Sequence, residues 1–246
     1  MIVRDDAPST TIWQKARDSF EKTFIREQRW KLILEGIATT LVISICSAAL
    51  GTILGFGLCM LRRTGNKVIM AITTVYIRLL QGTPLLVLLM ILYYIVFAKS
   101  GISGEVVAIL AFALNFAAYA SEIFRTGIEG VEKGQTEAAL ALGYTKSQAF
   151  FRIVMPQAAM NFMPVYKGEF ISLVKMTSIV GYIAVQDLTK MSDIIRARTY
   201  EAFFPLIATA VIYFILSALL TGLLKAIEIK ISPKRGKHKL KGVEMD

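Results

Sequence analysis

Three long apolar stretches dominate the pattern of hydrophobic and polar positions. Residues 36–61, 79–98 and 202–224 contain no charged side chain over 26, 20 and 23 residues, respectively. Because about 20 apolar residues of helix cross the hydrocarbon core of a bilayer, each stretch is long enough to be a membrane span. The pattern therefore predicts an all-α protein that crosses a membrane several times.

The second span is expected to be distorted. It belongs to a longer apolar stretch, 68–98, that is interrupted by Arg78, Gln81 and the sequence Gly82-Thr83-Pro84. Proline removes a helical hydrogen bond and clashes with the preceding turn. We therefore expect a kink or a break near Pro84.

The remaining spans are separated by one polar segment. A third span is predicted at 105–124, and residues 126–156 are too polar to lie in lipid. Residues 157–186 are apolar on average but carry three charged side chains, so hydropathy alone identifies this fourth span poorly. With 202–224 as the fifth, the sequence predicts five transmembrane helices and one long loop.

The first span, 33–61, contains Gly51 and Gly55, whose spacing lets two membrane helices approach closely.

The chain divides into three parts. The predicted parts are a polar amphipathic N-terminal segment, 1–32, a transmembrane domain, 33–226, and a basic tail, 227–246.

The basic residues predict the orientation in the membrane. The loop after the first span, the 126–156 segment and the tail are rich in Lys and Arg, whereas the alternate loops hold only Lys99 in one case and Lys190, Arg196 and Arg198 in the other. Cytoplasmic loops carry the excess of positive charge. The long loop and the C-terminus are therefore expected in the cytoplasm and, with five spans, the N-terminus outside.

Composition supports a membrane protein and excludes a soluble enzyme or a disordered chain. Hydrophobic residues make up 55% of the chain, charged residues 19%, and the mean hydropathy is +0.57. The net charge of +10 is explained better by basic cytoplasmic loops than by nucleic-acid binding. Cys46 and Cys59 lie about 20 Å apart along one helix, so we expect no disulfide.

No catalytic or metal-binding motif is present. The chain lacks a phosphate-binding loop and a Cys/His cluster, and its one histidine, His238, lies in the basic tail. The long loop instead predicts two short helices, residues 137–142 ending at Gly143 and residues 146–155 ending before Pro156. On periodicity alone this helix-turn-helix fits an amphipathic connector better than a docking element.

Its spacing, however, resembles a known motif. The loop reads Glu137-Ala-Ala, three residues, Gly143, nine residues, then Ile153-Val-Met155-Pro156. This resembles the E-A-A-x3-G-x9-I-x-L-P signature of the membrane subunits of ATP-binding-cassette (ABC) importers, with Met155 in place of the leucine.

Other segments resemble the polar-amino-acid branch of that family. Residues 76–87 resemble its R-G-T-P-L-L region, with Gln81 where arginine is usual, and residues 118–125 resemble its A-A-Y-x-x-E-x-x-R stretch. Residues 170–178 resemble F-I-S-L-x-K-D-T-S, with Met176 in place of aspartate, and Gly168 replaces a usual asparagine. The resemblance extends over about residues 35–230, and its two departures in the fourth span leave the identity of the amino acid open.

The resemblance implies a type I ABC importer permease fold and a non-enzymatic role in a bacterial cytoplasmic (inner) membrane. It implies a dimer of ABC ATPase subunits, a second copy of this permease or a similar permease, an extracytoplasmic solute-binding protein and an amino-acid substrate. No cofactor is expected on this chain, because ATP and Mg²⁺ bind the ATPase. Coupling to the ATPase is expected through Glu137, Ala138, Ala139, Gly143, Ile153 and Pro156.

Ionisable and polar residues at membrane depth are the candidates for the substrate path, because such groups are costly in lipid unless they are paired or face water. The candidates are Arg78, Gln81, Thr83, Glu169, Ser172, Lys175, Thr177 and Ser178. Glu169 and Lys175 are six residues apart, about 120° apart around a helix, so we expect no direct pair. Lys175 is expected to contact Glu122 or a backbone carbonyl.

Several alternatives remain at this stage. An ion-coupled secondary transporter usually shows inverted repeats and more spans, and nothing in five spans with one long loop supports it. A channel or a structural membrane scaffold would leave the loop motif unexplained. Within the importer class, an osmolyte or another small solute competes with an amino acid as the substrate.

Overall fold

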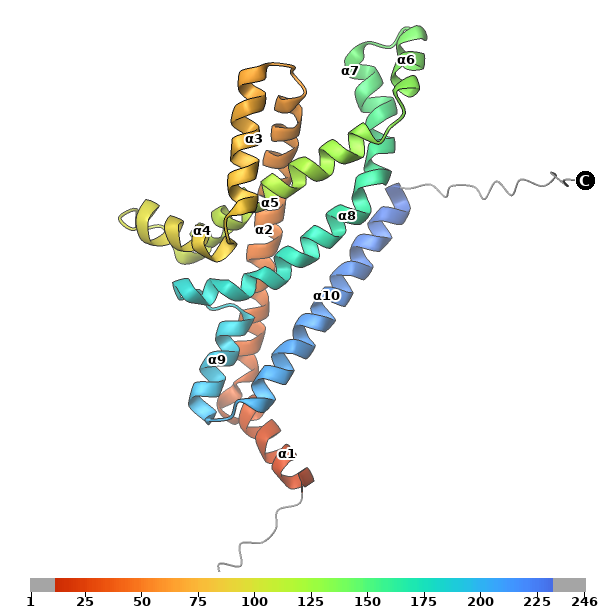
Figure 1. Ribbon diagram of the computed structural model, residues 1–246. Helices are drawn as coiled ribbons and strands as arrows, with labels where there is room; N and C mark the ends of the chain where they lie inside the picture. Colours follow the sequence, from red (N-terminus) through yellow and green to blue (C-terminus); the bar gives the residue numbers. More distant parts are fainter. Residues whose placement is uncertain (1–11, 232–246) are drawn as a thin grey trace, which may run out of the picture.

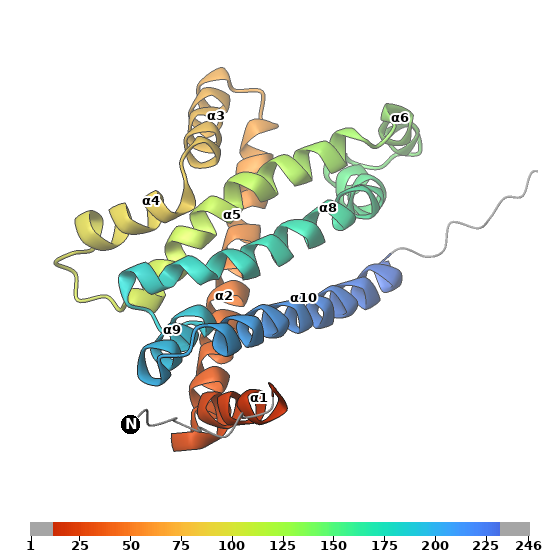
Figure 2. The same cartoon turned by 60° about the horizontal axis from the view of Figure 1, so that its bottom comes forward.

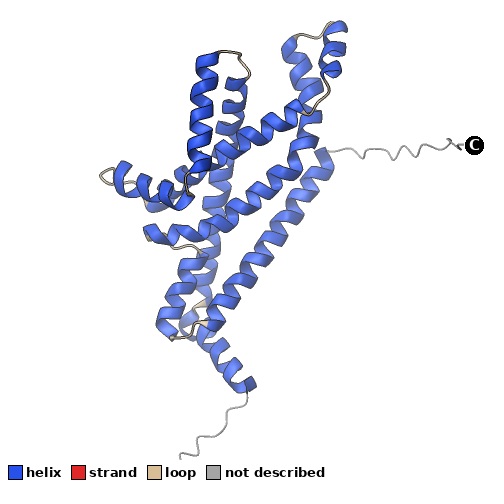
Figure 3. Ribbon diagram, viewed as in Figure 1, coloured by secondary structure: helices blue, strands red, loops and turns tan. Residues whose placement is uncertain are grey.

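The computed structural model describes residues 12–231, and this part of the chain contains helices and no strand (Figure 3). The α-helices are α1 (Ile12–Phe20), α2 (Trp30–Arg62), α3 (Lys67–Gly82), α4 (Leu85–Ile91), α5 (Gly104–Glu129), α6 (Lys133–Ala141), α7 (Lys146–Ala149), α8 (Met155–Met176), α9 (Leu188–Thr199) and α10 (Phe203–Ile231). Short π or 3₁₀ segments, η1 (Glu21–Ile25), η2 (Arg26–Gln28), η3 (Leu92–Val96), η4 (Phe150–Val154) and η5 (Thr177–Ile183), join several of them.

The centre of the fold is the crossing of α2 and α5 (Figures 1 and 2). Gly51 and Gly55 lie directly on α5: a Cβ atom at either position would come within 2.8 Å of the carbonyl oxygen of Ala113 or Ala117. Small residues permit this approach because no side chain separates the two backbones. The close packing expected from the Gly51–Gly55 spacing is therefore confirmed.

The second span is broken at Pro84, as predicted. Thr83 and Pro84 are both extended, and α3 and the helical segment 85–96 meet at 106°. The residue before a proline avoids helical dihedral angles, which explains why α3 ends at Gly82. The bend is much larger than a kink, and it directs α4 away from α3 to one side of the bundle (Figure 1).

The fourth span continues further than predicted. Helix α8 passes into η5, and after a 52° bend the chain forms α9 where the sequence suggested an external loop with Lys190, Arg196 and Arg198. Asp187 caps α9 by accepting hydrogen bonds from the backbone amides of Thr189 and Lys190 at 3.1 and 3.0 Å. The prediction of a loop was wrong because the polar side chains of α9 concealed its helical pattern.

Helix α9 packs on the N-terminal half of α2. A Cβ atom on Gly36 would lie 2.8 Å from the Cα of Leu188, and the amide of Leu188 donates to the hydroxyl of Thr40 at 3.3 Å. The Asp187 carboxylate is completely buried and also accepts from the Tyr213 hydroxyl of α10 at 3.2 Å. Buried polar groups therefore connect α2, α9 and α10 at one end of the bundle.

The last helix, α10, returns beside α8 (Figures 1 and 2). Near its C-terminal end Glu228 forms an ion pair with Lys167 of α8. Helix α10 continues to Ile231, beyond the boundary drawn at residue 226, and the rest of the predicted tail lies outside the described residues. Three helices are long and apolar enough to cross a membrane, or five if each bent pair forms one span, as the predicted five-span fold requires.

The segment before α2 packs against the rest of the described chain. The Ser19 hydroxyl donates to Glu201 at 2.8 Å, Lys22 pairs with Glu201 at 3.6 Å, and the rings of Phe20 and Phe204 lie 6.3 Å apart. Residues 12–28 thus pack on the α9–α10 turn, whereas residues 1–11 lie outside the described part.

The loops rich in Lys and Arg gather at one end. The α2–α3 turn, the loop containing α6 and α7, and the end of α10 all lie away from α1 and from the α9–α10 turn (Figures 1 and 2). This arrangement agrees with the grouping of the basic segments. Cys46 and Cys59 are both free thiols, which confirms that they form no disulfide.

The glycine contact gives a direct test of the central packing. We expect the double substitution Gly51→Ala/Gly55→Ala to destabilise the protein by about 1–3 kcal/mol, because each new methyl group collides with α5. Thermal unfolding in detergent measures the effect. Gly57→Ala is the matched control on the same helix, since its Cβ meets nothing within 4 Å. Equal stability of the double variant and the control would contradict the packing described here.

Candidate functional site

The predicted helix-turn-helix exists as a compact unit, which we call the loop hairpin (residues 133–154, comprising α6, α7 and η4). Helix α6 ends as Gly143 adopts a left-handed conformation, with φ at +86°. The amides of Gly143 and Tyr144 donate to the carbonyls of Leu140 and Ala139 at 3.0 and 3.1 Å. These two bonds form a Schellman motif. The expected termination of the first helix at Gly143 is therefore confirmed.

The second arm of the hairpin begins with a capping box that the sequence analysis missed. The Gln148 amide donates to the Thr145 hydroxyl at 3.2 Å, and the Thr145 amide donates to the Gln148 side-chain oxygen at 3.0 Å. The spacing Thr-x-x-Gln is a sequence signal for such a start. The Schellman motif thus ends α6 and the capping box begins α7, so hydrogen bonds within the hairpin hold the turn on both sides.

Pro156 does not separate the hairpin from the fourth span. Residues 146–183 form a continuous helical path, with a π turn over residues 150–154 in which the Met155 amide donates to the carbonyl of Phe150. Proline cannot donate to the preceding turn, and the widened turn just before it accommodates the missing bond. The hairpin is therefore continuous with α8 through this turn.

The hairpin has an outer surface of small, charged and large apolar side chains. Glu137, Ala138 and Gly143 are exposed, and so are the large apolar side chains of Leu142 and Phe151, at 79% and 58%. Ile153 is half-buried and Pro156 is exposed. Leu142 and Phe151 were not singled out from the sequence, although apolar residues in a polar loop are a signal for contact with another molecule.

Ala139 differs from its neighbours. Only 4% of its surface is exposed, because α6 packs against α7 and η4 on this side. Ala149 of the opposite arm is completely buried. The small size of Ala139 is therefore required for packing within the hairpin.

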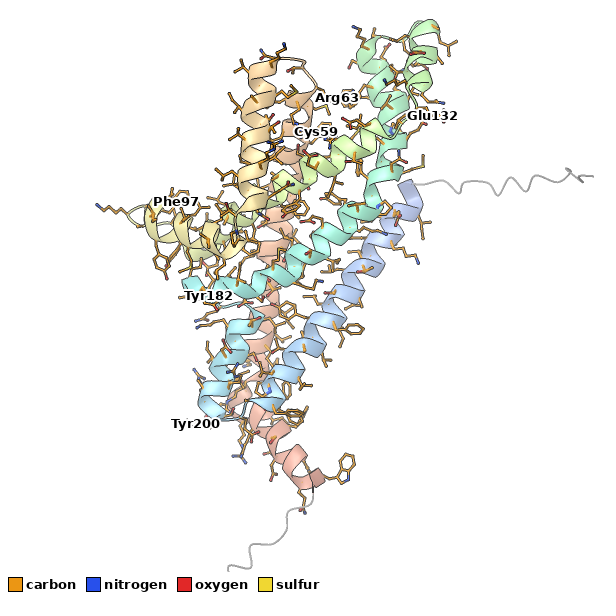
Figure 4. The ribbon with its side chains drawn as sticks, viewed as in Figure 1. Cys59, Arg63, Phe97, Glu132, Tyr182 and Tyr200 are labelled. Atoms are coloured by element: carbon orange, nitrogen blue, oxygen red, sulfur yellow. The ribbon has the colours of Figure 1, made fainter. Side chains whose placement is uncertain are left out.

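An ionic network joins the ends of α2 and α5 beside the base of the hairpin. Glu122 of α5 pairs with Arg62 at the end of α2 and with Arg125 at 2.7 Å, and Arg125 also pairs with Glu129 at 2.6 Å. Next to this network the guanidinium of Arg63 lies over the ring of Phe150, 5.5 Å from its centroid. Figure 4 shows Arg63 near the end of α2.

The candidates for the substrate path fall into two groups. Arg78 and Gln81 are exposed on α3, and Thr83 lies at the corner between α3 and α4. The other five, Glu169, Ser172, Lys175, Thr177 and Ser178, lie along α8 and the start of η5. The structure shows no ion pair between the groups, although α4 packs against η5.

Within the second group the roles differ. Thr177 is completely buried and donates to the carbonyl of Val174 at 2.8 Å, so it has a structural partner. Ser178 lines a cavity of about 540 Å³ together with Lys190 and Asp193 of α9. Glu169 is half-buried, and no hydrogen bond or ion pair to it occurs within residues 12–231.

Of the two pairings expected for Glu169 and Lys175, the structure agrees with one and differs from the other. Glu169 and Lys175 form no ion pair with each other, as expected from their spacing. Lys175, however, does not contact Glu122, whose carboxylate is held by Arg62 and Arg125. The prediction of a contact with Glu122 was wrong because the C-terminal arginine of α2 reaches α5 and holds this carboxylate. No hydrogen bond from Lys175 to a backbone carbonyl occurs within residues 12–231 either.

Comparison with known proteins identifies the family. Residues 51–233 match the family described as "Binding-protein-dependent transport system inner membrane component". The chain belongs to this family. The permease is 37% identical over 203 residues to the putative glutamine transport system permease protein GlnP of Rickettsia typhi, an alignment that covers 81% of this chain and 92% of that protein.

Further relatives agree. The arginine transport system permease protein ArtQ of Bacillus subtilis is 38% identical over 201 residues, covering 81% of this chain and 92% of the relative. A solved structure described as an amino acid ABC transporter with histidines matches with a TM-score of 0.74 at 35% identity, covering 81% of this chain and 94% of that chain. The inward-facing MetNI methionine ABC transporter matches with a TM-score of 0.74 at 18% identity, which shows the fold alone.

These matches establish the architecture and the general role. The protein is a multi-pass membrane permease with the type I importer fold, and it is the translocation subunit of an ABC importer rather than an enzyme. The alternative of an ion-coupled secondary transporter is thereby excluded.

Proposed function

We propose that this permease forms the path for a polar amino acid that an extracytoplasmic binding protein delivers, and that a separate ATPase drives it through the loop hairpin. The observation that carries the proposal is the hydrogen-bonded hairpin, exposed at one end of the bundle and continuous with α8. The substrate class follows the names of two relatives, a putative glutamine and an arginine transport system permease.

The implied assembly contains two ATPase subunits and two permeases, either identical or similar, in the bacterial cytoplasmic membrane. ATP and Mg²⁺ would bind the ATPase and no cofactor would bind this chain. The hairpin and the C-terminus would face the cytoplasm and the N-terminus the outside. The gathering of the basic segments at the end that carries the hairpin supports this orientation.

Coupling would occur at the outer surface of the hairpin. Ala138 and Gly143 permit close approach, Leu142 supplies an apolar contact, and Glu137 supplies a charged one. Ala139 keeps the two arms together from within, and the π turn before Pro156 transmits displacement to α8. Because a ligand shifts a conformational equilibrium only through differential contacts, closure of the ATPase pair would favour one permease state through this surface.

Substrate recognition would involve Glu169. An amino acid carries an ammonium group that needs an anionic acceptor, and Glu169 is a half-buried carboxylate on α8 without a partner among the described residues. Lys175 on the same helix is a donor for the substrate carboxylate. Ser172 and Ser178 would add hydroxyl groups along this path, Arg78 and Gln81 would contribute from α3, and Thr83 from the corner between α3 and α4.

The neighbouring alanines of α6 test the coupling surface. We expect Ala138→Leu to lower ATP-driven uptake at least about tenfold. Losing a few kcal/mol of binding free energy at the centre of the docking interface is enough to weaken attachment of the ATPase to this extent. Uptake and ATP hydrolysis are measured together in proteoliposomes containing the complete transporter. Ala138→Ser, which keeps the side chain small, is expected to transport normally.

Ala139→Leu separates docking from folding. Since Ala139 is buried, the larger side chain should loosen the hairpin and increase amide hydrogen exchange over residues 133–154, whereas Ala138→Leu should leave this exchange unchanged. Normal uptake by Ala138→Leu would contradict the proposed surface.

A charge-neutral variant tests the substrate site. We expect Glu169→Gln to raise the KM for amino-acid uptake about tenfold or more, because a hydrogen bond to a charged group contributes about 1.5–3 kcal/mol. Glu105→Gln, an exposed carboxylate at the start of α5, is the control and should behave as wild type. An unchanged KM in Glu169→Gln would remove Glu169 from the substrate path.

A further inference from the structure

A cavity of about 490 Å³ lies at the base of the loop hairpin, between the hairpin and the ends of α2 and α5. Its cationic lining residues come from three places: Arg63 follows α2, Lys133 begins α6 and Lys146 begins α7. Apolar side chains, among them Phe150 and Val154, form much of the remaining wall. The proposed coupling surface does not use this cavity.

The charges around the cavity are not balanced within the described chain. Its one acidic lining residue, Glu129, is paired with Arg125 at 2.6 Å. Arg63, Lys133 and Lys146 have no carboxylate partner within residues 12–231. Within residues 12–231 the Arg63 guanidinium lies against the face of Phe150 and donates no hydrogen bond, which leaves its N–H donors available. The cavity therefore favours an anion.

Its position favours an anion that is attached to the membrane. The cavity lies at the ends of α2 and α5, which are both long and apolar enough to be membrane spans. A ligand at this level has a polar end among the three cations and an apolar part along Phe150 and its neighbours. Phospholipids with a net negative charge combine these properties, and basic pockets at the ends of membrane helices bind such headgroups.

We infer that this cavity, between the loop hairpin and the ends of α2 and α5, holds the headgroup of an anionic phospholipid. The phosphate lies among Arg63, Lys133 and Lys146, and the glycerol end rests on the apolar wall. A lipid bound here links the hairpin to the bilayer and to the end of α2 at the same time.

The experiment is native mass spectrometry of the full-length permease, with the subunits that co-purify with it, after equilibration in micelles containing equal amounts of phosphatidylcholine and phosphatidylglycerol. The wild-type complex is expected to retain phosphatidylglycerol selectively. In the triple variant Arg63→Gln/Lys133→Gln/Lys146→Gln this retention should fall at least about tenfold, since each cation near the membrane surface contributes about fivefold.

A matched variant removes the same charge from positions that do not line the cavity. Lys67→Gln/Arg152→Gln/Lys225→Gln changes three cations at the same end of the molecule and should keep selective retention. All six side chains are exposed, so both triple variants are expected to fold as wild type. An equal loss in the two variants would show non-specific attraction and would overturn the proposal.

Two further arms distinguish other occupants. Excess inorganic phosphate should not displace phosphatidylglycerol; displacement would show a site for free phosphate and overturn the lipid assignment. In another outcome the permease alone retains phosphatidylglycerol and the ATPase-bound complex does not. That result would assign the cavity to the ATPase interface and overturn the proposal. Equal binding of the two lipids by the wild-type complex would also reject the proposal. None of these results depends on transport activity.

Discussion

The close contact between α2 and α5 is the constraint on which the rest of this permease depends. Gly51 and Gly55 bring the two backbones together without intervening side chains, and a methyl group at either position collides with a carbonyl of α5. Helix α8 packs on α5, and α9 packs on α2 through Gly36. The loop hairpin leaves the bundle from the end of α5, so its position is set by the same contact. In lipid, where apolar burial does not drive helix association, such packing is the main source of specificity.

Charged side chains within the bundle divide into two kinds. Some are paired between helices: Arg62 and Glu122 join α2 to α5, and Lys167 and Glu228 join α8 to α10. These pairs satisfy groups that would otherwise be costly near lipid, and they align helices far apart in the sequence. Glu169 has no such partner among the described residues. A charge that the fold leaves unpaired at this depth is therefore the better candidate for contact with a zwitterionic substrate.

Local signals predicted much of the fold, and long-range contacts account for what they missed. The break at Pro84 and the end of α6 at Gly143 follow from the dihedral preferences of single residues, so the sequence was sufficient for both. Helix α9 was missed because its capping residue, Asp187, is recognisable only once the helix is suspected. The Lys167–Glu228 pair joins positions 61 residues apart and has no local signature. The loop motif identified the coupling segment but did not reveal that Ala139 faces inward.

The central claim is that an ATPase docks on the outer surface of the loop hairpin. The most direct measurement is to solubilise the tagged full-length permease gently from its native membrane and identify the proteins that co-purify with it. The account predicts recovery of a subunit with a phosphate-binding loop, and its loss in Gly143→Asp, which adds a negative charge to the outer surface of the hairpin. Gly143→Asn has the same shape and tolerates the left-handed conformation, so it should retain the subunit. A wild-type permease that purifies without any nucleotide-binding subunit in several detergents, or equal recovery with Gly143→Asp, would contradict the account.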